Sequence, residues 1–377
     1  MKIAVFTGHR TENLANPLER TNEDVIIVSN TSSNLIKRAV MTAKDGRREL
    51  KNQNVDIVIG DHAGVVSFIA SLLAVAYSIP FALRLGGNIW EINREKLREH
   101  VTNRNYGGIA LITVLIFINR ITFRLSDCYL TISNTVERAI IKNTETTPDR
   151  IGTIGVPLAY DTFADASPKA IRKKFNLNGS RLLITVTNLR FRKKYEALRD
   201  ALPQIEQILN DNEDLQFIIA GDGTYLEPLK NDIDSSFSND VRDKVHFLGF
   251  IDDVQGLYAA ADAMVYVSYE EGFGNIIQEA MAAGCPVVAN DCEGLGEQIT
   301  DGETGILVAS PTDPELTRAI TQLLYEEQRE EIIQNARAYV SEVSDPDKVG
   351  QEIVAELRNM CDTVDTKSSL FSKFWTR

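Results

Sequence analysis

Short apolar runs alternate with longer amphipathic segments along this chain. Between the runs, helical spacing predicts helices at Ser33–Glu49, Val65–Ala76 and Thr135–Lys142. Runs rich in β-branched residues predict strands in the first half at Lys2–Phe6, Asp24–Val28, Val55–Ile59, Phe81–Leu85, Cys128–Ile132 and Ile151–Ile154. Buried strands separated by such helices indicate a parallel sheet with helices on both faces.

The same alternation restarts after residues 158–180, a stretch with Pro168 and a basic cluster that we interpret as a linker. Strands are predicted at Leu182–Val186, Leu215–Ala220, Val245–Leu248, Ala263–Val267, Pro286–Ala289 and Gly305–Val308. Helices are predicted at Tyr195–Leu209, Tyr225–Asp232, Val254–Ala261, Asn275–Ala283 and Pro314–Tyr325. This pattern predicts an α/β protein with two Rossmann-like domains, at 1–157 and 181–345, that face each other across a cleft. Within 346–377, a last helix at about Asp347–Asn359 is expected to return to the first domain.

Composition narrows the class of protein. The net charge of −13 and the pI near 5.0, without a strong basic patch, argue against a nucleic-acid partner. The four cysteines form no Cys-x-x-Cys pair, which is typical of reduced thiols in a cytosolic protein. The first residues read as a strand rather than a signal peptide, and no run reaches the ~18 apolar residues of a membrane span. We therefore expect a cytoplasmic protein.

The stretch from Tyr269 to Ala289 carries the most specific chemistry. A strand ends there in a loop with Gly272 and Gly274, and a helix begins near Asn275. Glycines let a backbone approach a ligand closely, and the amides of a helix start favour a diphosphate. Glu279 falls about one turn inside that helix, where a carboxylate can accept both hydroxyls of a ribose. Glu271 lies before the helix, near whatever the phosphate carries.

Seven residues separate Glu271 from Glu279, and with "EAMAAGCPVVA" and "GETGILV" this spacing resembles glycosyltransferase family 4 (group 1). These are retaining glycosyltransferases of the two-Rossmann-domain type called GT-B. The resemblance implies that Glu279 holds the ribose of a nucleotide-sugar and that Glu271 holds its sugar. It also implies that the amides of Phe273, Gly274 and Asn275 face the sugar and diphosphate. The first domain would then bind the acceptor and the second the nucleotide-sugar.

Two further segments of the second domain agree with this resemblance. Gly221 and Asp222 belong to a turn similar to the family's Gly-Asp-Gly turn. Residues 186–195 occupy the place of a family motif whose Arg and Lys clamp the leaving diphosphate. The alignment puts Asn188 at the arginine and Lys193 at the lysine, so Arg190 or Arg192 is expected to supply the missing charge.

The first domain resembles the family more loosely. Residues 79–88 stand where members often read Thr-Leu-His-Gly, and Gly86 occupies the histidine position. Arg84, Asn88 and His62 are therefore the candidates for the acceptor or sugar side.

The predicted activity is transfer of a sugar from a UDP- or GDP-type donor to a glycan or lipid-linked acceptor. Lys193, a neighbouring arginine and the helix start would stabilise the departing diphosphate by electrostatics. No cofactor is expected, and the two Asp-x-Asp runs, Asp232–Asp234 and Asp345–Asp347, lie on a helix end and in a helix-start turn rather than at a metal site. Two alternatives stay open: a related GT-B enzyme such as an epimerase or phosphorylase, and a non-catalytic GT-B subunit that partners an active transferase.

The acceptor side also raises the question of a membrane. Residues 109–118 form an apolar run flanked by Arg104, Arg120 and Arg124. This run is too short to span a bilayer, but it suits either a helix in the interface or a buried core helix. The tail 367–377 has apolar residues among Lys373 and Arg377 and is a second candidate anchor. Peripheral contact with the inner face of the membrane is one expectation from this pattern.

Overall fold

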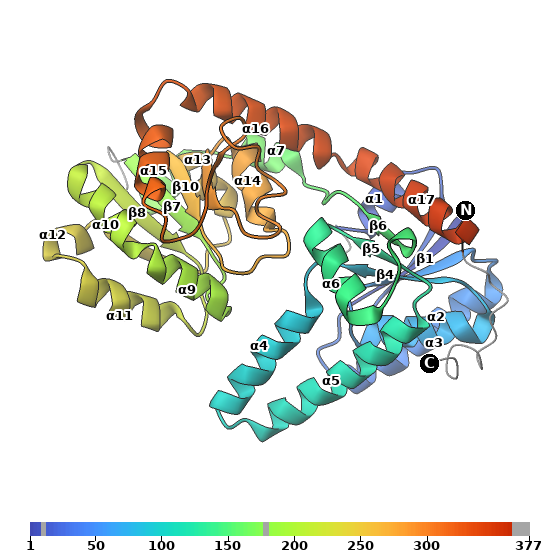
Figure 1. The fold of residues 1–377 in the computed structure, drawn as a ribbon. Helices are drawn as coiled ribbons and strands as arrows, with labels where there is room; N and C mark the ends of the chain where they lie inside the picture. The colour runs from blue at the N-terminus through green and yellow to red at the C-terminus, as the bar shows by residue number, and fades with distance from the viewer. Residues whose placement is uncertain (9–12, 176–180, 364–377) are drawn as a thin grey trace. The chain divides into compact units, whose positions relative to one another are not determined.

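The computed structural model describes residues 1–8, 13–175 and 181–363, with the backbone alone for 361–363. The tail proposed as a second anchor, 367–377, lies outside the described residues. The chain forms two compact units. The first consists of Met1–Pro157 and the segment that begins at Pro346, and the second is Leu158–Asp345. Each is an α/β unit with its own sheet (Figure 1), and each is described by itself.

The first unit is built on a parallel sheet with strand order β2-β1-β3-β4-β5-β6. Its strands are β1 (Lys2–Thr7), β2 (Asp24–Ser29), β3 (Ile57–Asp61), β4 (Phe81–Leu85), β5 (Cys128–Thr131) and β6 (Ile151–Thr153). β3, β4 and β5 are buried along their whole length, as expected for central strands covered on both faces.

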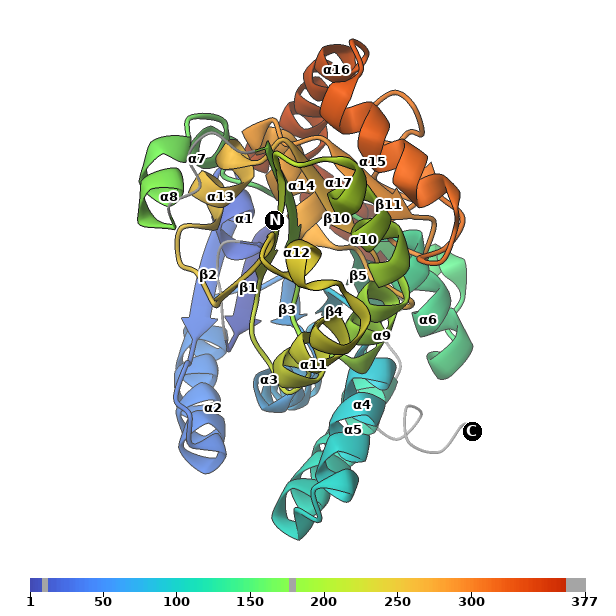
Figure 2. The ribbon, with the colours of Figure 1, turned by 90° about the vertical axis from the view of Figure 1, so that its left-hand side faces the viewer.

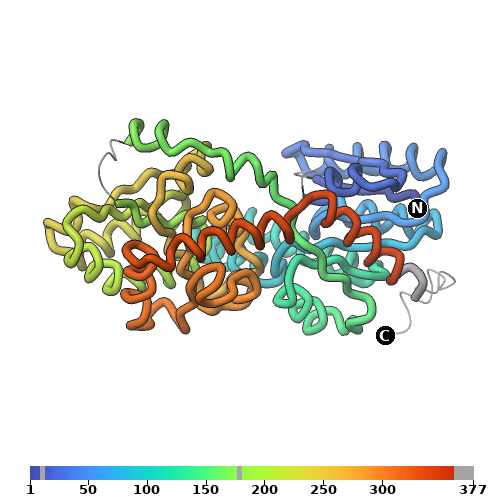
Figure 3. The backbone as a smooth tube through the Cα atoms, turned by 90° about the horizontal axis from the view of Figure 1, so that it is seen from above, coloured from blue at the N-terminus to red at the C-terminus, as the bar shows by residue number. Residues whose placement is uncertain are grey.

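Helices cover both faces of this sheet. They are α1 (Ala15–Glu19), α2 (Leu35–Asn52), α3 (Val65–Tyr77), α4 (Ile89–Thr102), α5 (Tyr106–Leu125), α6 (Asn134–Thr144), the 3-10 turn η1 (Pro148–Arg150) and α17 (Pro346–Thr363). α2, α3 and α5 pack side by side on one face, and α4 pairs with α5 (Figures 1 and 2). On the opposite face α17 lies against α1 and β6, as seen from above in Figure 3. The last helix therefore joins the first unit, as the sequence predicts.

The second unit has a parallel sheet with order β12-β11-β10-β7-β8-β9. Its strands are β7 (Arg181–Val186), β8 (Leu215–Ala220), β9 (Val245–Gly249), β10 (Ala263–Tyr266), β11 (Val287–Asn290) and β12 (Ile306–Val308). Its helices are α7 (Tyr160–Ala164), α8 (Pro168–Lys174), α9 (Arg192–Asp200), α10 (Leu202–Asp211), α11 (Leu226–Ser236), α12 (Asn239–Arg242), α13 (Val254–Ala260), α14 (Asn275–Ala283), α15 (Glu315–Tyr325) and α16 (Arg329–Val343). Two apolar clusters, one on each face of the sheet, form its core. The predicted α/β class with two Rossmann-like sheets is confirmed.

The structure differs from the predicted elements at three places. The predicted helix Tyr195–Leu209 is interrupted at Ala201, two residues before Pro203, and forms α9 and α10. The stretch interpreted as a linker contains α7 and α8, which bury Phe163 and Ile171 in the second unit. The apolar run at 109–118 belongs to the twenty-residue helix α5, which by length and composition alone is long enough to cross a membrane, with a third of its apolar window buried.

Candidate functional site in two sheet edges

The loop between β10 and α14 lies at the carboxyl edge of the second sheet, the edge at which ligands bind in such sheets. β10 ends at Tyr266, and Asn290 on β11 exchanges two hydrogen bonds with the backbone of Ser268, at 2.9 and 3.0 Å. α14 begins at Asn275 after Gly274, whose φ of +83° is a left-handed conformation that favours glycine. The helix start thus follows directly on a loop that is anchored at β11.

A second segment fixes the glycine loop from the other side. A side chain on Gly294 would place its Cβ 2.3 Å from the carbonyl oxygen of Gly272, so the two backbones touch. Gly294 N–H donates to the carbonyl of Glu271 at 3.1 Å. The buried Gln298 amide donates to the carbonyl oxygens of Phe273 and Gly274. This packing positions the loop residues Gly272 to Asn275 before any ligand binds.

Glu271 is held by a tyrosine and a lysine. The Tyr266 hydroxyl donates to Glu271 Oε2 at 2.6 Å, and Lys194 Nζ lies 2.6 Å from the same oxygen. Lys194 also donates to the Tyr266 hydroxyl at 2.8 Å. Burial, followed by the negative charge of Glu271, raises the pKa of Tyr266 well above its ordinary value, so the hydroxyl stays a donor. The three groups form a closed network that fixes the carboxylate and supplies it with a positive charge.

Glu279 has a similar partner. Tyr258, on α13 and fully buried, donates from its hydroxyl to Glu279 Oε2 at 3.1 Å. Burial and then the charge of Glu279 raise the pKa of Tyr258 well above its ordinary value. Both glutamates of the motif are thus oriented by buried tyrosines.

The turn at Gly221 and Asp222 packs against the loop after β7. A Cβ on Gly221 would lie 1.8 Å from the carbonyl oxygen of Thr187, and one on Gly223 would lie 2.3 Å from the amide nitrogen of Arg190. Both glycines also have φ values above +140°. The Asn188 side chain accepts from the Arg190 N–H at 3.1 Å within the same loop. Asn188, which the resemblance aligns with the family's arginine, therefore stabilises the turn.

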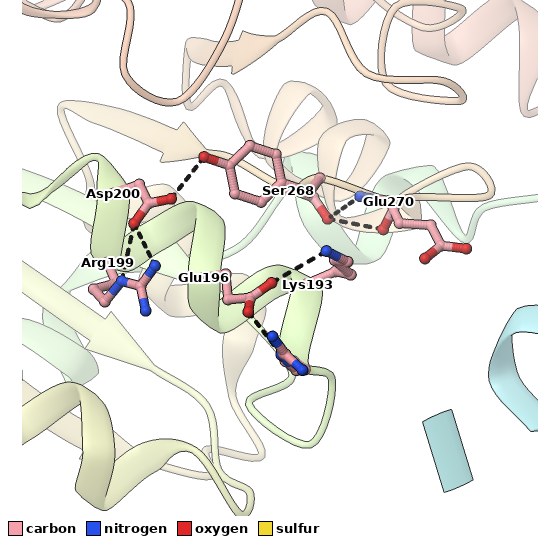
Figure 4. A network of polar contacts seen from close by, with 8 residues as sticks. Lys193, Glu196, Arg199, Asp200, Ser268 and Glu270 are labelled. Carbon is pink, nitrogen blue, oxygen red and sulfur yellow. Dashed lines mark hydrogen bonds and ion pairs between the residues drawn. The ribbon is translucent and has the colours of Figure 1, made fainter. Parts of the chain in front are cut away.

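The two lysines at the start of α9 have different surroundings. Lys193 Nζ lies 3.2 Å from Glu196 Oε2, and Arg192 Nε is 2.6 Å from the other oxygen of that carboxylate (Figure 4). Nearby, the Tyr269 hydroxyl donates to Asp200 at 2.7 Å. Only one residue further along, Lys194 contacts Glu271. The structure thus brings Lys194, and not Lys193, to the first motif glutamate, while the Arg190 side chain lies on the exposed turn.

The carboxyl edge of the first sheet carries a charged cluster. Arg84, 1% exposed on β4, pairs through Nη1 with Asp61 Oδ1 of β3 at 2.9 Å. His62 Nδ1 lies 2.9 Å from that same oxygen. Burial by itself would raise the pKa of Asp61, but the hydrogen bond from His62 and the charge of Arg84 outweigh it, and the pKa falls to about 2. Asp61 is therefore an anion that orients the His62 ring.

His62 occupies the space beside Gly86, the glycine that the resemblance aligns with the family's histidine. A Cβ on Gly86 would lie 2.7 Å from His62 Nε2, so the imidazole fills the volume next to position 86. His62 has a φ of +64°, and its N–H donates to the carbonyl of Arg84 at 2.9 Å. Asn88 caps α4 by accepting from the Glu91 N–H at 3.2 Å. Among the three first-domain candidates, only His62 presents a half-exposed ionisable ring at this edge.

Metal-binding side chains do not gather in the described part of the chain: no group of three or more His, Cys, Asp or Glu residues there could hold a metal ion. In the two Asp-x-Asp runs, Asp232 accepts from the Tyr195 hydroxyl at 2.7 Å, and Asp347 pairs with Arg20 at 3.2 Å.

Sequence reasoning missed four residues that build these edges: Lys194, Tyr258, Tyr266 and Gln298. The two tyrosines fall in apolar runs where they read as core residues, and nothing in the sequence marks their hydroxyls. Lys194 carried a detectable signal, because two consecutive lysines at a helix start point about 100° apart and either can face the sheet.

A comparison with protein families finds a match in the second unit of the chain. Residues 167–339 match the family model described as Glycosyl transferases group 1. This range covers most of the second unit and includes both motif glutamates. Over this range, a little under half of its length, the chain is similar to the group 1 glycosyltransferases.

Relatives and solved structures agree with that class. An alpha-D-kanosaminyltransferase of Streptomyces kanamyceticus is 30% identical over 187 residues, which are 48% of this chain and 47% of the relative. A phosphatidyl-myo-inositol mannosyltransferase of Mycobacterium leprae is 35% identical over 136 residues, 35% of this chain and 34% of the relative. The chain thus spans about half or less of the length of these relatives. The structure of Anabaena Alr3699/HepE in complex with UDP-glucose has a TM-score of 0.67 at 19% identity, with 95% of this chain and 99% of that chain covered. The shared fold is GT-B.

Proposed function

We propose that this protein is a retaining glycosyltransferase that moves a sugar from a nucleotide-sugar to a glycan or lipid-linked acceptor. The observation that carries the proposal is the pair Glu271 and Glu279 around a glycine loop at the carboxyl edge of a group 1 domain, each carboxylate held by a buried tyrosine. The second unit would bind the donor, and the first unit the acceptor.

In the proposed donor site, Glu279 accepts the ribose hydroxyls, and the backbone amides from Phe273 to Asn275 bind the diphosphate. Tyr258 donates a hydrogen bond to one oxygen of the Glu279 carboxylate and thereby fixes the orientation of the carboxylate toward the ribose. Gly221 and Asp222, on the neighbouring turn, complete the wall of the site. A UDP- or GDP-type donor is proposed, and the Anabaena structure with UDP-glucose supports the UDP type.

The departing diphosphate needs positive charge that is in place before the C1–O bond stretches. Lys194 provides such a charge, since its ammonium already lies beside Glu271 and Tyr266. We propose that Lys194 takes the role that the alignment gave to Lys193, with Arg190 on the adjoining turn as an additional cation. No step in this scheme requires a metal ion or a resident cofactor.

On the acceptor side, we propose that His62 supplies the imidazole that is absent from position 86. Asp61 accepts from Nδ1, which leaves Nε2 for a sugar or acceptor hydroxyl. Arg84 and Asn88 then act as positioning residues, because Arg84 is buried on Asp61 and Asn88 caps a helix. A cytoplasmic location with peripheral contact at the membrane is part of the same proposal and suits a lipid-linked acceptor.

A second candidate function is that of a non-catalytic subunit. Asn188 and Gly86 favour it, because both stand where the family carries a charged or ionisable residue. Lys194 and His62 argue for the enzyme, because each places the missing kind of group nearby from another position.

A donor panel distinguishes the two functions. The purified chain is incubated with UDP- and GDP-sugars and an extract of glycans and lipids, and the release of nucleoside diphosphate is measured. The enzyme releases it from one class of donor, and the anomeric configuration of the product equals that of the donor. Absence of release from every donor, together with tight binding to another transferase, would favour the subunit. Inverted product configuration would contradict the retaining mechanism.

A further inference from the structure

The exposed apolar side chains of the first unit are concentrated on one helical layer. All nine large apolar residues that the structure describes as exposed in this unit lie on α2, α3, α4 or α5. They are Ile36, Val40, Met41, Leu72, Val101, Tyr106, Leu111, Val114 and Phe117. Tyr106 is 77% exposed and Phe117 is 64% exposed. Soluble proteins scatter such residues singly, so their concentration on adjoining helices marks an interaction surface.

The charge of this layer is opposite to that of the whole chain. Residues 34–53 and 89–125, which contain α2, α4 and α5, hold twelve Lys and Arg against five Asp and Glu, and α3 holds no charged residue. Their net charge is +7 in a chain of −13, so the remaining residues sum to −20. A surface that is both apolar and basic, on an acidic protein, matches an anionic lipid bilayer.

The two kinds of residue are also ordered along the helices. On the exposed side of α2, the apolar residues Ile36, Val40 and Met41 come first, with Lys37 among them, and Lys44 and Arg47 follow. On α5, Tyr106 to Phe117 come first, and Arg120 and Arg124 follow. Helices that connect parallel strands run antiparallel to them, so both apolar halves lie toward the carboxyl edge of the sheet and both basic halves toward the amino edge. α2 and α5 both pack beside α3 (Figure 2). This packing brings the two apolar halves to one end of the layer and the two basic halves to the other.

α5 belongs to this layer along its second half and does not stand apart from the fold. Asn119, Thr122, Phe123 and Leu125 are buried, and Trp90 of α4 stacks on the Phe123 ring. These turns could reach the interior of a bilayer only by leaving the sheet. The first half, with Val114 and Phe117 exposed, is the part available to lipid.

We propose that the exposed side of α2, α3, α4 and α5, named here the basic–apolar layer, binds the surface of an anionic lipid bilayer with its helices lying in the interface. Leu111, Val114 and Phe117 enter the headgroup boundary, and Lys44, Arg47 and Arg120 contact the lipid phosphates. This inference rests on the proposed function for the idea of a lipid-linked acceptor, and it names the surface that would bring the chain to it.

Vesicle flotation of the full chain tests the proposal. The vesicles are phosphatidylcholine alone or phosphatidylcholine with a third of phosphatidylglycerol. We expect flotation with the anionic vesicles and at least tenfold less with the neutral ones. Val114→Ser combined with Phe117→Ser should lower the partition coefficient by about tenfold or more, because two side chains leave the headgroup boundary. Phe250→Ser removes a phenylalanine of the second unit that is 76% exposed, and this variant should leave the partition coefficient unchanged.

Charge variants separate the basic halves from general electrostatics. Lys44→Gln with Arg47→Gln should weaken binding by about fivefold per charge on anionic vesicles. The matched pair Lys169→Gln and Lys173→Gln, exposed lysines of α8 in the second unit, should have no effect. Equal loss in both pairs would overturn the assignment of the surface, as would absence of flotation by the native chain.

Two further measurements distinguish a failure of this inference from a failure of the proposed function. Sedimentation of the Val114→Ser, Phe117→Ser chain that shows a dimer turned into a monomer, without flotation of the native chain, would assign the layer to a second copy and overturn the proposal. UDP and GDP titration on the same preparations reports the donor site independently. Flotation without nucleotide binding contradicts the proposed function alone, and nucleotide binding without flotation contradicts this inference alone.

Discussion

Candidate site residues lie at the carboxyl edge of each sheet, but the edge of the second unit resembles the family much more closely than that of the first. In the second unit, the loop around Glu271 and Glu279 follows the group 1 pattern, and the match to the family model, residues 167–339, lies entirely within this unit. In the first unit, a buried Arg84–Asp61 pair and His62 stand at the corresponding edge. Nucleotide-sugars share a diphosphate and a ribose, so one design serves many donors. Acceptors share no such group, so the first unit, which we propose binds the acceptor, is free to differ.

The comparison also shows how each unit replaces a missing residue. The resemblance aligns Asn188 with the family's arginine, and Lys194 on the following helix carries charge to Glu271. It aligns Gly86 with the family's histidine, and the His62 ring lies against that glycine. In both cases the group comes from a neighbouring element at the same sheet edge. The account therefore predicts that Lys194 and His62 both contribute to transfer in spite of their unusual positions.

The largest effect is expected from Glu271→Gln. Loss of the carboxylate removes the charge that organises Lys194 and Tyr266, and transfer should fall by about 10²–10³-fold. Turnover of the proposed donor is the measurement, and Glu303→Gln, on an exposed loop of the same unit, is the control. Turnover within threefold of the native chain would remove Glu271 from the mechanism.

The next effect separates the two lysines. Lys194→Gln leaves Glu271 without its ion pair in a partly buried site and should lower kcat by about 10–100-fold. Lys193→Gln breaks an exposed pair with Glu196 and should lower it by no more than about threefold. The reverse order in steady-state kinetics would restore Lys193 to the role that the alignment assigned.

His62 provides the corresponding test in the first unit. His62→Asn keeps a residue that tolerates positive φ and should reduce transfer by about tenfold, because one hydrogen bond to sugar or acceptor is lost. Adding Gly86→His to this variant should recover part of the activity, since the ring that occupied that space is gone. Gly86→His alone should be harmful, because its Cβ would meet the His62 ring. Unchanged transfer activity in His62→Asn would contradict the proposal that His62 takes the place of the family's histidine.

The two tyrosines should act on different quantities. Tyr258→Phe removes one hydrogen bond to Glu279 and should weaken nucleotide affinity by about tenfold, at most a small change in kcat accompanying it. Tyr266→Phe should lower kcat by about tenfold and leave nucleotide affinity unchanged. Calorimetry gives the nucleotide affinity of each variant, and steady-state kinetics gives its kcat. Equal effects of the two substitutions on affinity would show that the two glutamates do not have separate roles.

The smallest effect concerns acid stability. The pKa of Asp61 is about 2 in the folded chain, below its ordinary value of 3.8, so ionised Asp61 stabilises the fold above about pH 4. That contribution, about 2 kcal/mol, is lost as the pH falls toward 2. Urea unfolding at pH 4.5 and 2.5 should show a smaller decrease in stability for Asp61→Asn than for the native chain. A similar decrease in both would place the acid sensitivity elsewhere.

Much of the fold could be predicted from the sequence, because buried parallel strands are short β-branched runs with clear ends. Phe81–Leu85 and Leu215–Ala220 have the predicted boundaries, and the other strands differ by one or two residues. The break at Ala201 and the helices within 158–174 were missed, since Pro203 starts a helix as readily as it ends one and short helices have little periodicity. The local sequence pattern therefore predicts the strands of the two sheets better than it predicts helix breaks and the segment between the two units.

The site could be predicted only in part, for a different reason. Glu271, Glu279 and the glycines appear in the sequence because their spacing is local. Tyr258 and Gln298 contact the site from elements 21 and 24 residues away, and only the folded sheet brings them there. The choice between Lys193 and Lys194 depends on the rotation of one helix, which alignment does not fix.

The most direct test of the central claim is calorimetric titration of UDP and GDP into the native chain, Glu279→Ala and the control Glu303→Ala. The account predicts micromolar binding of one nucleotide, unchanged in the control. In Glu279→Ala the affinity should be weaker by at least about thirtyfold, because a charged contact of ~2 kcal/mol is lost. Equal affinity of native chain and Glu279→Ala, or no binding of either nucleotide, would contradict a nucleotide-sugar site at this edge.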